Sequence, residues 1–180
     1  MNPHRVFHAG LAAACLGLLG FGYYLQFARG LEPCPLCILQ RLAFAAVAAI
    51  AVIAALHGAP GIWRKVYGAM IAVTALAGGG VAARQVWLQH LPPEQVPECG
   101  PGLDYMLQVF PWTDVLRKVL TGSGECAEPG WRFLTLSIAE WSLLWFCGLA
   151  ACAILHIIFG GRMQTLDRQA ENAVSATNEV

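Results

Sequence analysis

Four of the seven cysteines lie outside the long apolar segments of the chain, where their thiols could carry out redox chemistry. Cys34 and Cys37 form a C-x-x-C motif directly before an apolar segment, whereas Cys99 and Cys126 stand 27 residues apart. A C-x-x-C pair at the start of a helix is typical of dithiol redox centres, because the helix N-terminus favours the thiolate, the form that attacks disulfides. The other three lie within apolar segments, where we expect them to act as small hydrophobic side chains: Cys15, Cys147 and Cys152.

Other uses of these cysteines fit the sequence less well. Ile38 follows Cys37, so the C-x-x-C-H signature of c-type haem attachment is absent. Cys99 and Cys126 lack the close second pair of Cys or His that a zinc site needs, so we expect no metal. A permanent structural disulfide suits Cys99 with Cys126, which would close a long loop. It suits Cys34 with Cys37 poorly, because so small a ring constrains little of the unfolded chain.

Two further residues could take part in the chemistry. Arg41 lies four residues after Cys37, hence on the same face of the expected helix and about 6 Å further along it. A charge inside a membrane span costs roughly 2.5–3.5 kcal/mol at the centre, which favours a functional role. Arg41 could stabilise a Cys37 thiolate or an acceptor oxygen that gains negative charge, or its guanidinium could simply reach the lipid headgroups. His90 could supply a proton, although a lone histidine near the interface commonly has no such role.

The composition indicates the kind of molecule that must position these residues. Of 180 residues, 57% are apolar and 12% charged, against roughly 45–50% and 25% in soluble domains. Eleven Lys and Arg balance eleven Asp and Glu, so there is no basic excess for binding nucleic acid. Four apolar runs reach the length of about 20 residues that a spanning helix needs: residues 6–27, 38–56, 66–83 and 138–159. We expect the first run to be retained, since it is longer than a signal-peptide core.

The sequence therefore predicts an all-α membrane protein, a bundle of four transmembrane helices that forms one domain over residues 1–160. Four crossings place both termini on one side of the membrane, and the loops 28–37 and 84–137 together on the other. The four cysteines outside the spans then share one side of the membrane. One pair close together in the sequence and one pair far apart, on the same side, favour a relay from pair to pair over two structural disulfides. Lys and Arg are too evenly distributed to fix the orientation. The tail 161–180 is predicted to be flexible.

Local patterns add detail to this picture. Apolar residues recur at helical spacing on both sides of Pro111, which predicts two short amphipathic helices that rest on the bilayer surface or on the protein. Ser137 and Glu140 have the spacing of a capping box at the start of the fourth span. Three glycines, 78–80, favour close packing late in the third span.

In this order, the motifs resemble the bacterial disulfide bond formation protein B (DsbB) family of membrane quinone reductases, over about residues 10–160. The motifs that carry the resemblance are Cys34-Pro35-Leu36-Cys37 with Gln40-Arg41, Arg84-Gln85-Val86-Trp87-Leu88-Gln89-His90, Cys99-Gly100-Pro101-Gly102, Ser123-Gly124-Glu125-Cys126-Ala127-Glu128, and Trp131 through Trp141. Thr135 and Ala139 depart from the family pattern, in which glycine and proline are common at these positions.

The resemblance implies an enzyme, a protein-disulfide:quinone oxidoreductase of the bacterial inner membrane. Its loops would face the periplasm, an oxidising compartment, and both termini would be cytoplasmic. The implied partner is a soluble, periplasmic, DsbA-like thiol oxidase of thioredoxin fold. The partner's dithiol would open a Cys99–Cys126 disulfide, with Cys99 taking the partner's cysteine. Cys126 would then exchange with the Cys34–Cys37 pair.

The resemblance also implies a cofactor. Electrons would pass from Cys37 to a bound quinone, ubiquinone or menaquinone, with Arg41 and His90 at its border. Two alternatives remain at this point. Enzymes similar to vitamin K epoxide reductase also combine four helices with C-x-x-C, but there the motif comes late in the chain. A non-catalytic membrane scaffold would use both disulfides only to brace its loops.

Overall fold

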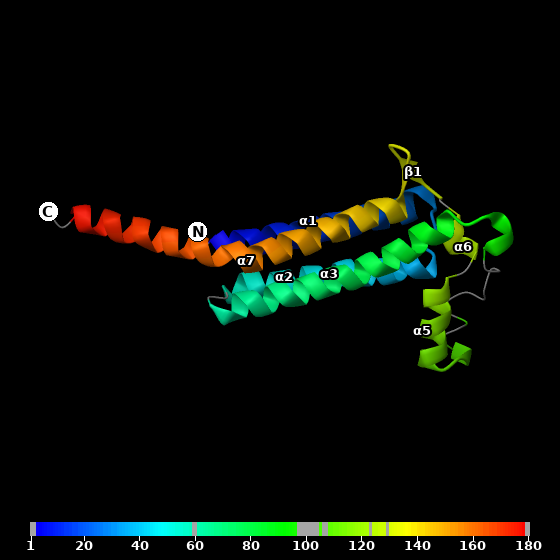
Figure 1. The fold of residues 1–180 in the computed structure, drawn as a ribbon. Coiled ribbons are helices and arrows are strands. Elements are labelled where there is room, and N and C mark those ends of the chain that lie inside the picture. Colours follow the sequence, from blue (N-terminus) through cyan, green and yellow to red (C-terminus); the bar gives the residue numbers. More distant parts are fainter. Residues whose placement is uncertain are drawn as a thin grey trace.

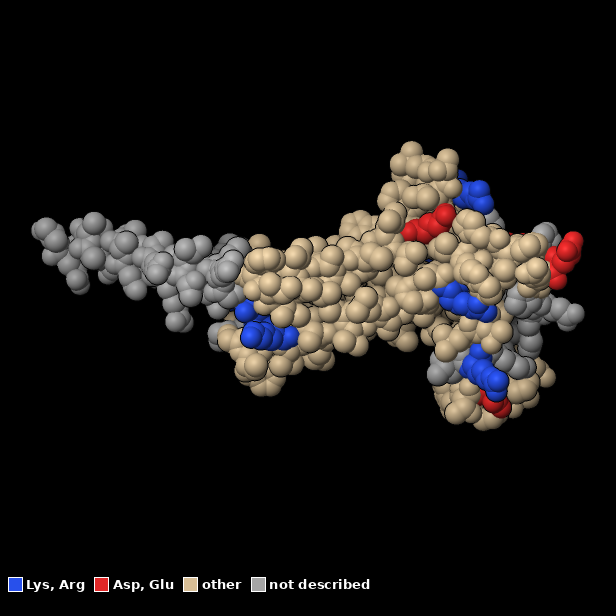
Figure 2. Space-filling view, viewed as in Figure 1, with Lys and Arg blue, Asp and Glu red and all other residues tan. Residues whose placement is uncertain are grey.

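The computed structural model describes residues 3–58, 61–96, 105, 108–122, 124–128 and 130–178. Four long helices make up most of the chain: α1 (Pro3–Arg29), α2 (Pro35–His57), α3 (Ile62–Gln89) and α7 (Ile138–Asn178). Each contains a segment long and apolar enough to cross a membrane, which confirms the four predicted spans. On the face shown in Figure 2, charged side chains gather toward the two ends of the bundle and leave an uncharged region between them, as expected for a surface in contact with lipid.

The helices form an elongated bundle with both chain ends at one end and the smaller elements at the other (Figure 1). Helix α2 packs against α1 and α3, and α3 packs against α7. The small elements between α3 and α7 are η1 (Pro93–Gln95), α5 (Trp112–Thr121), α6 (Gly124–Ala127), β1 (Arg132–Phe133) and β2 (Leu136–Ser137). The two strands pair antiparallel as a short hairpin, with Arg132 opposite Ser137.

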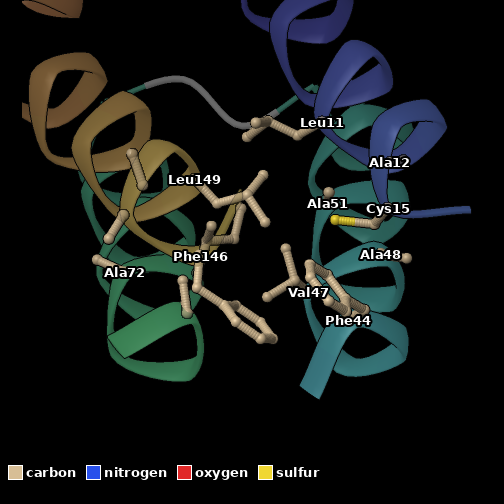
Figure 3. Close-up of a cluster of buried hydrophobic side chains, with 14 of the residues drawn as sticks. Leu11, Ala12, Cys15, Phe44, Val47, Ala48, Ala51, Ala72, Phe146 and Leu149 are labelled. Carbon is tan, nitrogen blue, oxygen red and sulfur yellow. The ribbon is translucent and has the colours of Figure 1, made fainter. Parts of the chain in front are cut away.

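The core of the bundle is built from small and aromatic side chains that interlock between the helices. Phe146 of α7 stacks on Phe44 of α2, with ring centroids 4.0 Å apart, and Cys15 of α1 is fully buried nearby (Figure 3). Gly78 of α3 leaves room for the Phe146 ring, because a Cβ there would lie 2.5 Å from two ring carbons. The predicted packing role of these glycines is therefore confirmed at Gly78.

The end of the bundle that holds the chain termini is fixed by buried polar side chains. Arg64 of α3 is buried and donates a hydrogen bond to the backbone oxygen of His156 on α7, at 2.6 Å. The His156 ring stacks on Phe7 of α1 and lies 3.3 Å from a ring nitrogen of His4. These contacts join α1, α3 and α7 far from the cysteines outside the spans.

Helix α7 begins as the sequence predicted. The backbone N–H of Ser137 donates to the Glu140 carboxylate at 2.6 Å, and the Glu140 N–H donates to the Ser137 hydroxyl at 3.3 Å. This reciprocal pair is a capping box, which satisfies amides that have no partner in the first helical turn.

The structure differs from the sequence-based expectations in three places. Helix α3 continues to Gln89, past the predicted end of its span at residue 83. The tail, for which no helix was predicted, continues α7 to Asn178, because it contains no Gly or Pro after residue 161 and is rich in good helix formers. Its flexibility stays a prediction. The β1–β2 hairpin was not predicted, since its turn residues Leu134 and Thr135 both have positive φ, which neither favours.

Of the two predicted amphipathic helices, α5 is confirmed and begins after Pro111, whose carbonyl accepts from the N–H groups of Asp114 and Val115. Most of the one expected before Pro111 lies outside the described residues. Val115 and Val119 of α5 are buried against the loop-side ends of α2 and α3. The inner face of α5 therefore rests on protein, while Trp112 is exposed.

Candidate redox site

The C-x-x-C motif forms the first turn of α2. Cys34 is the N-cap residue and its sulfur accepts a hydrogen bond from the Cys37 N–H at 3.4 Å. Pro35 occupies the first turn, where its missing N–H leaves no helical bond unmade. The sulfurs of Cys34 and Cys37 lie 2.8 Å apart. The local sequence thus places the two thiols side by side at a helix N-terminus, as predicted.

Cys126 reaches this pair from the other loop. It lies on α6, is fully buried, and belongs to the same apolar cluster as Cys34, together with Leu36 and Leu88. Hydrogen bonding with the Cys126 side chain raises the pKa of Cys34 well above its usual range, and the hydrogen bond with Cys37 and burial act in the same direction. Cys34 therefore lies next to a third sulfur, and its thiolate is disfavoured there. Cys99, the fourth predicted site cysteine, lies outside the described residues.

A pocket of about 550 Å³ opens beside Cys37, between α1, α2, α7 and the hairpin. Its walls are mainly apolar and aromatic, with Phe44, Trp141 and Trp145 among them. Cys37 and Arg41 both line it, one helical turn apart on α2. This volume falls in the range of sites that hold small molecules, which are commonly apolar with a few placed polar groups.

Arg41 is anchored to α1 at the wall of this pocket. Its guanidinium donates to the side-chain oxygen of Gln26 at 2.5 Å and to the backbone oxygen of Gly22 at 3.0 Å, and it lies over the Tyr23 ring. The guanidinium that the sequence predicts inside a span is thus hydrogen-bonded to two oxygens and held in place. It can offer positive potential to an oxygen in the pocket.

His90 lies elsewhere. It follows the last residue of α3 and is exposed, with its Nδ1 at 2.8 Å from the backbone oxygen of Val86. It is not among the residues that line the pocket. The structure therefore brings together Cys34, Cys37, Arg41 and Cys126, and leaves His90 apart from them.

Two buried glutamines beside the sulfurs were not predicted from the sequence. Gln85 of α3 donates through Nε2 to the sulfurs of Cys34 and Cys37, at 3.4 and 3.3 Å. Gln40 of α2 donates to Gln85 Oε1 at 2.7 Å. The sequence did contain a signal for these two residues, because an amide side chain in an apolar helix has to find a hydrogen-bond partner. Among the described residues, no three His, Cys, Asp or Glu side chains are placed to hold a metal ion.

Comparison with known proteins decides the family. The family model for disulfide bond formation protein DsbB matches residues 4–156. The chain belongs to the DsbB family. It is 55% identical over 152 residues to the disulfide bond formation protein B of Azoarcus sp. strain BH72, which covers 84% of this chain and 90% of the relative. The corresponding protein of Aromatoleum aromaticum is 52% identical over 153 residues, covering 85% and 92%.

Membership in the DsbB family agrees with the architecture and with the clustered sulfurs. The chain is a multi-pass membrane protein with a thiol oxidoreductase role in disulfide bond formation. In this DsbB family member, the three described sulfurs of the site lie at the loop end of the bundle, beside a pocket in its wall.

Proposed function

We propose that this protein reoxidises a soluble, periplasmic, DsbA-like thiol oxidase and passes the electrons through two cysteine pairs to membrane quinone. One observation carries the proposal: the sulfurs of Cys34, Cys37 and Cys126 meet beside an apolar pocket that also contains Arg41. Such a site can exchange disulfides on one side and hold an apolar electron acceptor on the other.

The first half of the reaction is thiol–disulfide exchange. A thiolate of the partner attacks Cys99 in a Cys99–Cys126 disulfide, and Cys126 leaves as a thiolate. The partner's second cysteine then attacks the mixed disulfide, so that the partner leaves oxidised and Cys99 and Cys126 are both reduced. In the second exchange, these two cysteines open the Cys34–Cys37 disulfide and close their own. Each exchange transfers two electrons and two protons overall.

The burial of Cys126 against Cys34 supports the second exchange. Because the two sulfurs already interact, the attack needs no large displacement of α6. Cys37, the other member of the tight pair, is the one that lines the pocket. The pair therefore receives electrons at Cys34 and presents them at Cys37.

The residues of the pocket fit a quinone. Aromatic and aliphatic walls suit an uncharged ring with an isoprenoid tail, and the Arg41 guanidinium can face a ring oxygen as that oxygen becomes negative. When bound there, ubiquinone or menaquinone supplies the two-electron oxidation that returns the Cys34–Cys37 dithiol to a disulfide. Arg41 orients the ring, while the aromatic walls exclude water. The family resemblance also assigns His90 to the border of the quinone site, and the proposal includes this assignment.

The same proposal assigns the orientation. The loop end would face the periplasm of the bacterial inner membrane, and both chain ends would face the cytoplasm. A reporter that is active only in the periplasm should then be inactive when fused after residue 180. An active reporter at that position would contradict the orientation.

The decisive experiment mixes the purified protein with ubiquinone and a reduced DsbA-like oxidase and follows quinone absorbance. We expect one quinone consumed for each pair of partner thiols oxidised, and no consumption by Cys34→Ser. Cys147→Ser is the matched control, since Cys147 is exposed on α7 and belongs to no part of the site. Absence of quinone consumption, or full activity in Cys34→Ser, would refute the proposal.

A second experiment separates the proposed enzyme from a scaffold with bracing disulfides. A partner variant that keeps only its attacking cysteine should open the Cys99–Cys126 disulfide, release Cys126 as a thiolate and remain bound to Cys99, because it has no second thiol to resolve the mixed disulfide. Cys126→Ser, which has no such disulfide to open, is the matched control and should form no adduct. A scaffold would form no such adduct, and non-reducing electrophoresis distinguishes the two.

A further inference from the structure

The amide of Gln85 lies between the two sulfurs of the C-x-x-C pair. Its Nε2 donates to Cys34 Sγ at 3.4 Å and to Cys37 Sγ at 3.3 Å, and its Oε1 accepts from the Cys37 thiol at 3.6 Å. The side chain comes from α3, the helix opposite the pair, and only 4% of it is exposed. A buried amide that bonds both members of a redox pair is placed to respond to their charge.

Gln40 fixes which end of that amide faces the sulfurs. Its Nε2 donates to Gln85 Oε1 at 2.7 Å, which holds the amide with its NH₂ group directed to Cys34 and Cys37. The same oxygen also accepts from the Cys37 thiol at 3.6 Å. Gln40 itself is 3% exposed and lines the pocket beside Cys37. A continuous chain of hydrogen bonds therefore runs from the pocket wall through two amides to the dithiol.

We propose that Gln85 is a positioning residue for the Cys34–Cys37 pair, whose amide donates to whichever sulfur carries negative charge and so makes the pair more oxidising. This inference deepens the proposed function, because it concerns the same redox pair. Its physical basis is the difference between the two oxidation states. A thiolate is a charged acceptor that gains strongly from two N–H donors, whereas the sulfurs of a disulfide are weak acceptors.

The donors therefore stabilise the reduced pair more than the oxidised pair. A reduced state that is more stable means a higher reduction potential, so the Cys34–Cys37 disulfide takes electrons more readily from the cysteines of the long loop. Gln40 acts one step further away, by preventing the Gln85 amide from presenting its oxygen to a thiolate.

The test is a redox equilibrium that contains neither partner nor quinone. Full-length protein in detergent, with Cys99→Ser and Cys126→Ser to isolate the pair, is incubated to equilibrium with reduced and oxidised dithiothreitol. Two electrons and two protons pass from dithiothreitol to the pair, opening the Cys34–Cys37 bond and closing the ring of the reagent. Mass spectrometry of alkylated peptides then gives the fraction reduced.

Gln85→Met keeps the length of the side chain and removes both donors. We expect the equilibrium constant to shift about tenfold toward the disulfide, which is about 30 mV for a two-electron couple. Alkylation of the reduced pair by iodoacetamide should also move to higher pH. The matched control is Gln89→Met, one turn along α3, because Gln89 bonds Ser137 and neither sulfur. It should leave both measurements unchanged.

Gln40→Met keeps the inference testable if Gln85→Met does not fold, since it frees the Gln85 amide without removing it. A smaller shift in the same direction is expected there. An unchanged equilibrium and pH profile in the folded Gln85→Met protein, or an equal shift in Gln89→Met, would overturn the inference. Because no quinone or partner is present, failure of quinone reduction in the enzymatic assay would leave this result standing, and the reverse also holds.

Discussion

Replacing Gly78 by alanine adds one methyl group at the tightest point of the core. The new Cβ would lie 2.5 Å from Cε1 and Cζ of Phe146 and 2.9 Å from the Cβ of Ala43. Both distances are too short for carbon atoms in contact, so the Phe146 ring must move. Overpacking of this kind costs typically 1–3 kcal/mol, so we expect it to lower the free energy of unfolding of Gly78→Ala by about that amount. The higher helix propensity of alanine offsets part of this loss.

Gly80 provides the control, because no atom lies within 4 Å of a Cβ built there. Both substitutions gain about 1 kcal/mol of helix propensity, so this gain cancels when the two variants are compared. Gly78→Ala should therefore be about 1–3 kcal/mol less stable than Gly80→Ala. Unfolding in detergent, followed by far-ultraviolet circular dichroism, measures the difference. Equal stability of the two variants would refute the packing argument.

The same substitution should reach the site. Phe146 stacks on Phe44, and Phe44 lines the pocket beside Cys37. A displaced Phe146 ring moves Phe44, so Gly78→Ala should raise the KM for quinone while disulfide exchange with the partner continues at its normal rate. Gly80→Ala should alter neither, which separates a change in the pocket from a general loss of folding.

Three further predictions address the site and the entry to α7. Arg41→Met should slow quinone reduction at least tenfold without blocking the mixed disulfide with the partner, since its charge faces the pocket; equal loss of both activities would contradict this. Ser137→Ala removes one half of the capping box and should cost about 0.5–2 kcal/mol of stability, read from thermal unfolding. Because hydrogen bonding to Cys126 raises the pKa of Cys34, Cys126→Ala should lower that pKa, and alkylation of Cys34 should then begin at a lower pH; an unmoved pH profile would exclude Cys126 as the cause.

The spans could be predicted because a bilayer imposes a strict requirement on sequence. A run of about 20 apolar residues is rare outside membrane-spanning helices, and each predicted run lies within an observed helix. The far end of α3 could not be predicted in the same way. Arg84 and Gln85 fall beyond the apolar run, but Arg84 donates to the carbonyls of Leu120 and Thr121 at the end of α5. Tertiary partners therefore prolong the helix past the predicted span.

In the site, likewise, some relations between residues could be predicted from the sequence and others could not. The spacing of Cys34, Cys37 and Arg41 lies within two turns of one helix, so their relation follows from helical geometry alone. The approach of Cys126 and Gln85 depends on how α6 and α3 pack against α2, which no local pattern encodes. For the same reason the sequence could not decide between the pocket and the solvent for His90, which the structure leaves exposed.

The burial of the sulfurs has a consequence for chemical selectivity. Only 8% of Cys34 is exposed and none of Cys126, so a small thiol dissolved in water reaches these two sulfurs slowly, and the half-buried Cys37 is the member of the pair more open to it. Peroxide meets the same barrier, which protects these cysteines from irreversible oxidation beyond the sulfenic state. The bundle thereby slows side reactions at Cys34 and Cys126, so that electrons at these two sulfurs pass mainly between the proposed partner and acceptor.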